Sequence, residues 1–145
     1  MAVTSTAEAL WEGDLPSGHG HVKGTSGGLS EVGVSWAART GRVPGLTSPE
    51  ELLASAEAAC FSMALSAGLG RMQKPPQELR VKAAATFDKV GDGWKVTTMA
   101  LEVTGRVPGI SATEFEAAAK AASEGCPISS VMKGNVQISV RATLL

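Results

Sequence analysis

Two cysteines are the residues of this chain best suited to chemistry, and each lies in a distinctive stretch. Cys60 lies in EAACFSMALS, which predicts a buried, alanine-rich helix, and Cys126 lies in EGCPIS. A thiol reacts as its thiolate, and at an unperturbed pKa of about 8.5 only ~3% is ionised at neutral pH. Burial in an apolar helix disfavours the charge further. Cys60 is therefore either an inert core residue or a thiol that depends on a nearby cation.

The strength of that dependence follows from Coulomb's law. A guanidinium at about 4 Å, at an effective dielectric constant near 20, favours the thiolate by roughly 4 kcal/mol, or about three pKa units. Cys126 stands between Gly125 and Pro127, where one predicted helix ends and another begins. We expect it at an N-cap, where the helix dipole favours a thiolate, and in a more exposed place than Cys60; the alternative is a small loop residue.

Three glutamates lie on the same predicted helix as Cys60. Glu51 follows Ser48 by three residues and is explained by a capping box. Glu57 precedes Cys60 by three residues and would raise its pKa, so we expect Glu57 to be solvated or to face a partner. Glu50 lies roughly 15 Å from Cys60 along a helix. It could contact the Cys60 of a second subunit if the two helices pack antiparallel about a two-fold axis.

Other site types find little support. His19 and His21 in GHGH lack a third ligand nearby, so we expect no metal site. The glycine-rich stretches match neither a phosphate-binding loop nor a dinucleotide fingerprint. Two cysteines are too few for a disulfide framework; they are either two inert thiols or two thiols that form a transient disulfide.

Composition sets the broad class. The 145 residues suit one domain, expected over 1–145, and 43% hydrophobic with 19% charged residues is a globular rather than a disordered profile. A net charge of −1 gives no basic field for nucleic acid. No uninterrupted apolar run reaches about 18 residues, so we expect no membrane span. The N-terminal segment lacks a basic start and an apolar core, so we expect no secretory signal and a cytoplasmic location.

The elements that must position the cysteines can be predicted from pattern and caps. Two or three strands are expected between Ala7 and Ala38, the clearest being VGVSWAAR, followed by a loop in TGRVPGLTS. A helix should begin at Pro49 and run to about Gly70. It is apolar on nearly every face, so it must be surrounded, and a second subunit is a natural way to complete this. We therefore expect a homodimer.

The second half of the chain predicts a hairpin, two helices and a last strand. ELRVKAAATFDKV and WKVTTMALEVTGR flank an Asp-Gly turn. Ser111 and Glu114 cap a helix that Gly125 closes, CPISSVMKG predicts a short helix, and NVQISVRATLL alternates as a strand. The order indicates an α+β fold with a mostly antiparallel sheet packed on two long helices.

Four stretches together resemble the OsmC/Ohr family of thiol peroxidases, whose names stand for osmotically inducible protein C and organic hydroperoxide resistance protein. They are WEGDLPSGHG, TSPEELLASAEAACFSMALS, PGISATEFEAAAKAASEGCPIS and VMKGNVQISV. The resemblance covers nearly the whole chain in order, and PEEL ten residues before ACFSMAL, together with GCPIS, is its specific part. ACFSMAL, WEGD and VPGI look closer to the OsmC branch.

The resemblance implies an OsmC-like, intertwined homodimer without a cofactor, with active sites at the subunit interface. It implies a peroxiredoxin-like reduction of organic hydroperoxides to alcohols, in which Cys60 becomes a sulfenic acid and then a Cys60–Cys126 disulfide. A dithiol then recycles the disulfide, and the resemblance suggests a lipoyl-type dithiol on a lipoylated protein. It places the family's arginine on Arg39 and its glutamate on Glu50. The loop after Arg39 is one residue longer than the usual pattern, which leaves Arg42 as a second choice.

This assignment of Arg39 and Glu50 provides the cation that Cys60 requires and gives a role to Glu50. Arg39 would supply the charge that Cys60 requires, and Glu50, acting on the other subunit's Cys60, would hold the guanidinium in a bidentate pair. Two alternatives stay open: a non-catalytic, stress-related binding dimer with buried thiols, and a thiol redox sensor that passes its oxidation to a partner protein.

Overall fold

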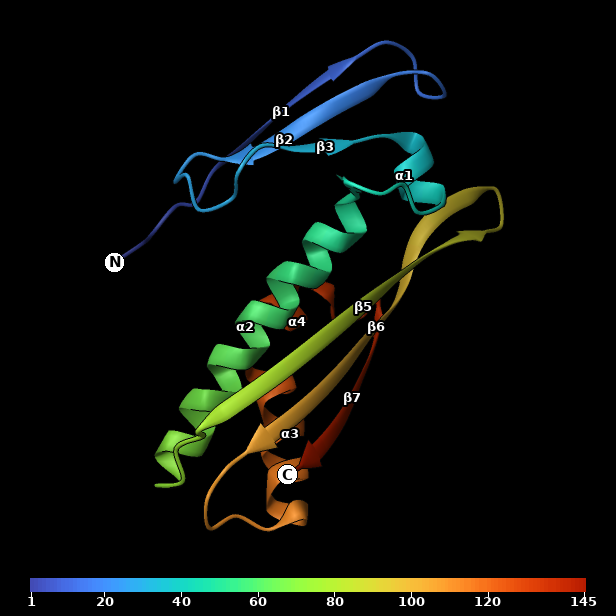
Figure 1. Cartoon of the computed structure of the whole chain (residues 1–145). Coiled ribbons are helices and arrows are strands. Elements are labelled where there is room, and N and C mark those ends of the chain that lie inside the picture. Colours follow the sequence, from blue (N-terminus) through green and yellow to red (C-terminus); the bar gives the residue numbers. More distant parts are fainter. The chain divides into compact units, whose positions relative to one another are not determined.

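The computed structural model describes residues 1–145, which fall into two compact units, Met1–Leu52 and Leu53–Leu145. The units contain four helices and two sheets, the mixed α+β class that the sequence predicts. Figure 1 labels these elements. The expectation of a single domain over 1–145 stays a prediction.

The first unit is built on a four-stranded sheet in the order β1-β2-β3-β4. β1 pairs with β2 and β2 with β3 in antiparallel register, whereas β4 runs parallel to β3. Three of these strands lie in the region predicted to hold two or three. The strands are β1 (Ala7–Glu12), β2 (His19–Gly24), β3 (Val32–Val34) and β4 (Leu46–Thr47).

Only the first three residues of VGVSWAAR form a strand, so the prediction of a strand along the whole stretch is wrong. β3 ends at Val34, and helix α1 (Trp36–Thr40) begins directly after Ser35. The Ser35 hydroxyl accepts a hydrogen bond from the backbone N–H of Ala38 at 3.0 Å. This N-cap satisfies a backbone N–H of the first helical turn and so favours a helix after Ser35. The alternating pattern alone would have predicted that the strand continues. The predicted loop that follows contains the short strand β4.

The second unit pairs a three-stranded sheet with helices. α2 (Pro49–Arg71) enters it from the first unit and is followed by β5 (Glu78–Val90), β6 (Gly93–Arg106), α3 (Ala112–Gly125), α4 (Pro127–Met132) and β7 (Gln137–Leu144). The predicted β5–β6 hairpin is antiparallel, but β7 runs parallel to β6 because the chain returns through α3 and α4.

The predicted fold differs from the structure in the number of sheets and in the length of the second helix, whereas the strand pairing is mostly antiparallel, as predicted. There are two sheets, and three of the five strand pairings are antiparallel. α2 has 23 residues, but α3 has only 14. The predicted capping box at Ser111 and Glu114 is present. At the start of α2, Glu51 N–H donates to the Ser48 hydroxyl at 3.1 Å, and the Glu51 carboxylate accepts a hydrogen bond from Thr47.

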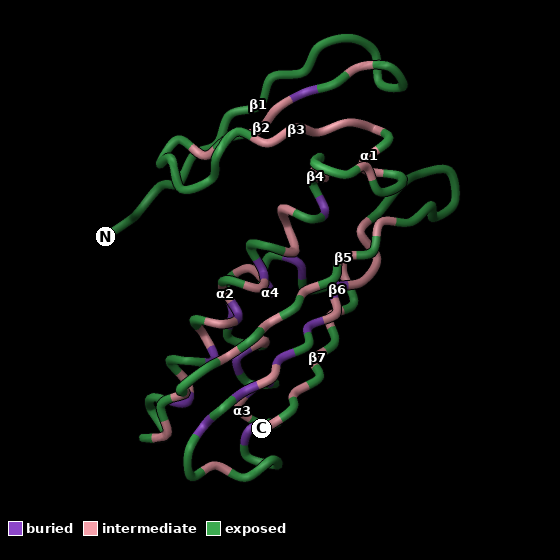
Figure 2. Tube along the Cα trace, in the orientation of Figure 1, coloured by how far each residue is buried: buried purple, intermediate pink, exposed green.

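The core of the second unit lies where α2, α3 and β6 meet (Figure 2). Phe61, Leu65 and Leu69 recur at four-residue spacing on one face of α2 and are fully buried. Phe115 of α3 is also fully buried and packs on Gly105 of β6, where a Cβ atom would lie 2.3 Å from the Phe115 ring. This close approach fixes the distance between helix and strand.

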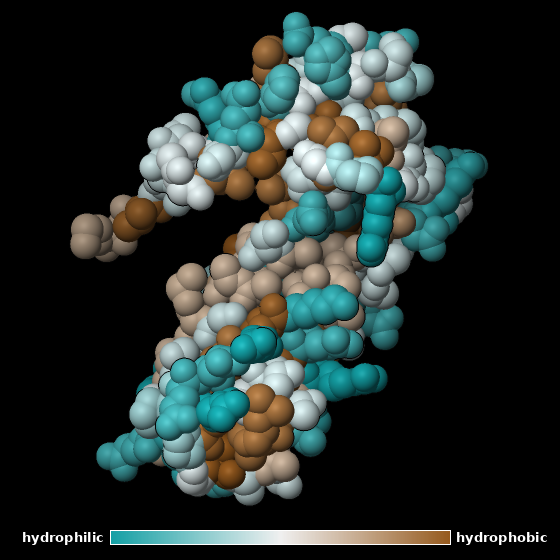
Figure 3. Space-filling view, in the orientation of Figure 1, coloured by the Kyte–Doolittle hydropathy of each residue, from teal (hydrophilic) through white to brown (hydrophobic).

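The rest of α2 is largely uncovered. Only 22% of its most apolar stretch is buried within the chain, and Figure 3 shows apolar surface along this helix. By length and composition α2 could cross a membrane, although the core helix of a soluble protein meets the same criterion. The absence of membrane contact stays a prediction.

Candidate functional site

Cys60 lies near the middle of α2, where its side chain is half-buried. It lines a cavity of about 680 Å³ between α2 and α3. The other lining residues are mostly small or apolar: Met63, Ala64, Ala67, Gly68, Arg71, Met72, Ala118, Ala121, Ala122, Gly125 and Pro127. The thiol therefore faces an accessible apolar space rather than a sealed core.

The surroundings of Cys60 oppose its ionisation. Burial raises the pKa of the Cys60 thiol, and a hydrogen bond with Cys126 and the nearby Glu57 charge raise this pKa further, whereas the backbone of Ile128 lowers it. No cation is among the groups that shift this pKa. In this fold, as expected from the sequence, Cys60 therefore needs a nearby cation to become a reactive thiolate at neutral pH.

Cys126 lies at the N-cap of α4, as predicted, but it is fully buried. The expectation of a more exposed thiol is wrong, because the junction between α3 and α4 turns the sulfur inward against α2. Its Sγ lies 3.8 Å from Glu57 Oε2 and makes no side-chain cap. The hydrogen bond with Cys60 brings the two thiols together.

Glu57 is fully buried, which overturns the expectation that it is solvated or faces a partner. Its Oε1 accepts a hydrogen bond from the Ser129 hydroxyl, and its Oε2 accepts one from Cys126. A buried carboxylate needs such donors. Its position three residues before Cys60 was the only signal in the sequence, since its partners lie 72 and 69 residues away along the chain.

Arg39 and Glu50 form a bidentate ion pair within the first unit, joining α1 to the start of α2. Arg39 Nε donates to both carboxylate oxygens at 3.0 and 3.2 Å, and Nη2 donates to Oε1 at 2.8 Å. The Glu50 side chain is only 7% exposed, so the pair is well shielded from water. Arg42 is exposed and forms no ion pair.

The predicted site residues thus form two groups. Cys60 and Cys126 meet in the second unit together with Glu57 and Ser129, and Arg39 meets Glu50 in the first. Each group is defined within its own unit, and the catalytic roles of these residues stay predictions.

Other parts of the chain offer different chemistry. His19 and His21 lie with ring centroids 6.4 Å apart, and no three His, Cys, Asp or Glu side chains are grouped to hold a metal ion.

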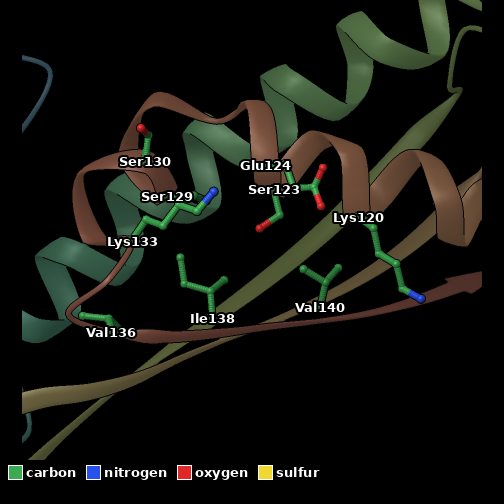
Figure 4. A pocket seen from close by; sticks show the side chains of 9 residues that line it. All are labelled: Lys120, Ser123, Glu124, Ser129, Ser130, Lys133, Val136, Ile138 and Val140. Carbon is green, nitrogen blue, oxygen red and sulfur yellow. The ribbon is translucent and has the colours of Figure 1, made fainter.

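A second cavity of about 390 Å³ lies between α3, α4 and β7 (Figure 4). It is lined by Lys120, Ser123, Glu124, Ser129, Ser130, Lys133, Val136, Ile138 and Val140, and it contains neither cysteine.

Comparison with known proteins identifies the family. A model described as OsmC-like protein matches residues 42–141. Peroxiredoxin OsmC of Escherichia coli is 38% identical over 138 residues, covering 95% of this chain and 96% of that protein. Organic hydroperoxide resistance protein OhrA of Bacillus subtilis is 32% identical over 112 residues, covering 76% of this chain and 77% of that protein.

Solved structures share the fold over the whole chain. An organic hydroperoxide resistance protein OsmC from Legionella pneumophila has a TM-score of 0.76 and 25% identity, covering 99% of this chain and 98% of that one. A second such protein, from Elizabethkingia anophelis, has a TM-score of 0.75 at 24% identity, with both chains fully covered. The chain therefore belongs to the family of OsmC-like proteins.

Proposed function

We propose that this protein is a cysteine-based peroxidase that reduces organic hydroperoxides to alcohols. The observation that supports this most is the pair of thiols: Cys60 lines an accessible apolar cavity and hydrogen-bonds with Cys126. The names of the relatives, peroxiredoxin and organic hydroperoxide resistance protein, support the same chemistry.

The reaction proceeds in three steps. The Cys60 thiolate attacks the terminal oxygen of the hydroperoxide, the O–O bond breaks, and the alkoxide takes a proton and leaves as an alcohol. Cys126 then attacks the Cys60 sulfenic acid, forming a disulfide and releasing water. A dithiol, such as a lipoyl group on a protein, reduces that disulfide by two exchanges and leaves as its own disulfide. No cofactor takes part.

Arg39 is the proposed activating cation, with Arg42 as the second choice. The Cys60 pKa is raised by its own surroundings, so the thiolate needs a positive charge from elsewhere. Arg39 suits this role because Glu50 holds its guanidinium in a fixed orientation. Glu50 lies roughly 15 Å from Cys60 along α2, so we propose that this pair serves the partner subunit's cysteine.

The proposed homodimer is supported by one face of α2. The exposed residues Ala56, Ala59, Met63, Ala67 and Gly70 recur at three- and four-residue spacing along this helix. Small residues in such a row allow two helices to approach closely, and Met63, which is 69% exposed, is costly to leave in water. Pairing two copies of α2 would cover this face.

The substrate class follows from the cavity. Its lining is mainly alanine, glycine and methionine, which favours an alkyl or fatty-acid hydroperoxide over hydrogen peroxide. Met63 supplies part of this surface, whereas its neighbour Phe61 lies in the core.

Thiol counting tests the proposal. Reduced protein is mixed with tert-butyl hydroperoxide and its free thiols are titrated, with Cys60→Ser and Cys126→Ser as controls. We expect the wild type to lose two thiols and Cys60→Ser to lose none. No loss at excess peroxide, with slow labelling of Cys60, would favour the binding dimer, and a stable disulfide that no dithiol reduces would favour the sensor.

A further inference from the structure

Glu57 is a buried charged group for which the proposed reaction has no role. It is fully buried, yet no arginine, lysine or histidine forms an ion pair with it. The other two glutamates of α2 are explained, since Glu50 pairs with Arg39 and Glu51 accepts a hydrogen bond from Thr47. Burying a carboxylate without a cation costs free energy, so a role in the chemistry of the site would explain why Glu57 is present.

Its two oxygens are each committed to one donor. Ser129 donates its hydroxyl to Oε1, and the Cys126 thiol donates to Oε2 across 3.8 Å. Ser129 thus fixes one carboxylate oxygen of Glu57 and leaves the other against the Cys126 thiol. Cys126 itself is fully buried, so water does not reach its proton. The acceptor in contact with that proton is Glu57.

We propose that Glu57 is the general base of the disulfide-forming step, with Ser129 as the residue that positions it. This inference rests on the proposed peroxidase function. The Cys126 S–H proton passes to Glu57 Oε2 as Cys126 Sγ attacks the sulfur of the Cys60 sulfenic acid. The S–S bond forms, the S–O bond of the sulfenic acid breaks, and the departing hydroxide takes the proton to leave as water. Glu57 ends the step in its starting state.

Glu57 has opposite effects on the two cysteines. Its charge contributes to raising the pKa of Cys60, so it does not assist the attack of Cys60 on the hydroperoxide. It assists only the second step, in which Cys126 must lose its proton. A substitution that removes the charge should therefore leave the first step unimpaired and slow the second.

The role of Glu57 is tested by measuring sulfenic acid formation and disulfide formation separately. Reduced wild type and Glu57→Gln are mixed with tert-butyl hydroperoxide; sulfenic acid at Cys60 is trapped with dimedone, and disulfide is followed by intact mass under denaturing conditions. We expect Glu57→Gln to form the sulfenic acid at least as fast as the wild type and the disulfide at least ~100-fold more slowly. The exposed Glu116→Gln, on α3, is the matched control and should behave as the wild type.

The pH profile of the second step separates a base from a merely structural residue. The titratable groups in contact here are Cys60, Cys126 and Glu57. Without Glu57, no side chain in contact with Cys126 accepts its proton, and the proton can leave only when the site opens to solvent hydroxide. The disulfide rate of Glu57→Gln should therefore rise with pH more steeply than that of the wild type. Ser129→Ala should slow the second step less than Glu57→Gln does, and the exposed Ser130→Ala should not slow it.

Three outcomes decide the matter. Equal disulfide rates in wild type and Glu57→Gln would overturn the role of Glu57. If Glu57→Gln does not fold, Glu57→Asp withdraws the carboxylate by one methylene and should slow only the second step; unchanged rates in that variant would likewise overturn it. A wild type that forms neither sulfenic acid nor disulfide would instead refute the peroxidase proposal.

Discussion

Cys60 illustrates how a reactive residue depends on groups outside its own segment. Burial, Cys126 and Glu57 all raise the pKa of its thiol, so this cysteine is less ionised at neutral pH than a solvated one. The bidentate pair of Arg39 with Glu50 offers a rigid cation that could reverse this. At the residue scale, activity should therefore depend more on Arg39 than on any neighbour of Cys60 within α2.

Arg39→Ala should slow the reaction of Cys60 with tert-butyl hydroperoxide by roughly 100- to 1000-fold at neutral pH, because a cation at contact distance is worth about three pKa units. The sign of the pH effect follows from the raised pKa. With less thiolate at a given pH, the rate of the variant should still be rising above pH ~8.5, the ordinary pKa of a cysteine thiol, because the pKa of Cys60 is raised. Stopped-flow measurement across this range checks the prediction.

Arg42→Ala is the matched control, since Arg42 is exposed and forms no ion pair. Its rate and pH profile should equal those of the wild type. A large loss in Arg42→Ala with an unaffected Arg39→Ala would transfer the activating role to Arg42.

At the element scale, the site depends on how α3 begins and how it packs. Ser111 and Glu114 fix the first turn, and Lys74 reaches Glu114 from the loop after α2 at 3.1 Å. Phe115, one residue on, fills the space over Gly105 of β6. α3 in turn ends at Gly125, directly before Cys126, so these contacts set the position of the buried thiol.

Glu114→Gln should lower stability in a pH-dependent way. Hydrogen bonds from Ser111 and Lys74 lower the pKa of Glu114 to about 2 from an ordinary 4.5. A lowered pKa in the folded state stabilises the fold above the unfolded value, and this contribution is lost as the pH falls from about 4.5 towards 2. Urea unfolding should therefore show a difference between wild type and variant at pH 7 that shrinks below about pH 4.5. A difference independent of pH would contradict this.

Gly105→Ala should destabilise the second unit. A Cβ atom there would lie 2.3 and 2.7 Å from two ring carbons of Phe115, which is fully buried. Overpacking of this kind costs typically ~1–3 kcal/mol. On the same strand, Gly93→Ala meets no atom within 4 Å and should leave the free energy of unfolding nearly unchanged. Equal effects of the two substitutions would show that α3 does not press on β6 at this point.

At the scale of the whole molecule, one chain leaves an apolar face of α2 in water and holds its two groups of site residues in separate units. The proposed homodimer accounts for both features. It would cover α2, and it would allow the Arg39–Glu50 pair of one subunit to serve the Cys60 of the other.

Sedimentation equilibrium should give about twice the 14.8 kDa mass of one chain. Met63→Lys places a charge on the exposed α2 face and should shift this mass towards the monomer, because an ammonium group buried in an apolar interface is strongly disfavoured. Val3→Lys, at an 86% exposed position before β1, is the control. A monomeric wild type would refute the dimer.

Mixed dimers test whether each site draws on both subunits. Glu50→Ala and Cys60→Ser should each be impaired alone. In a mixed dimer, the intact Cys60 of the first variant would face the intact Glu50 of the second, so peroxidase activity should return in part. No recovery after unfolding and refolding the two variants together would place Glu50 and its Cys60 in the same subunit.

The sequence by itself determined what depends on near neighbours. Contacts between residues a few positions apart determine the helix caps at Ser48 and Ser111 and the β5–β6 hairpin. The two cysteine motifs are likewise continuous stretches of sequence, so the family could be inferred from them. Only the tertiary structure decided that Cys126 is sealed from water, that Glu57 binds it across 69 residues, and that β7 runs parallel to β6. These features arise from packing between distant segments, which local caps and periodicity do not encode.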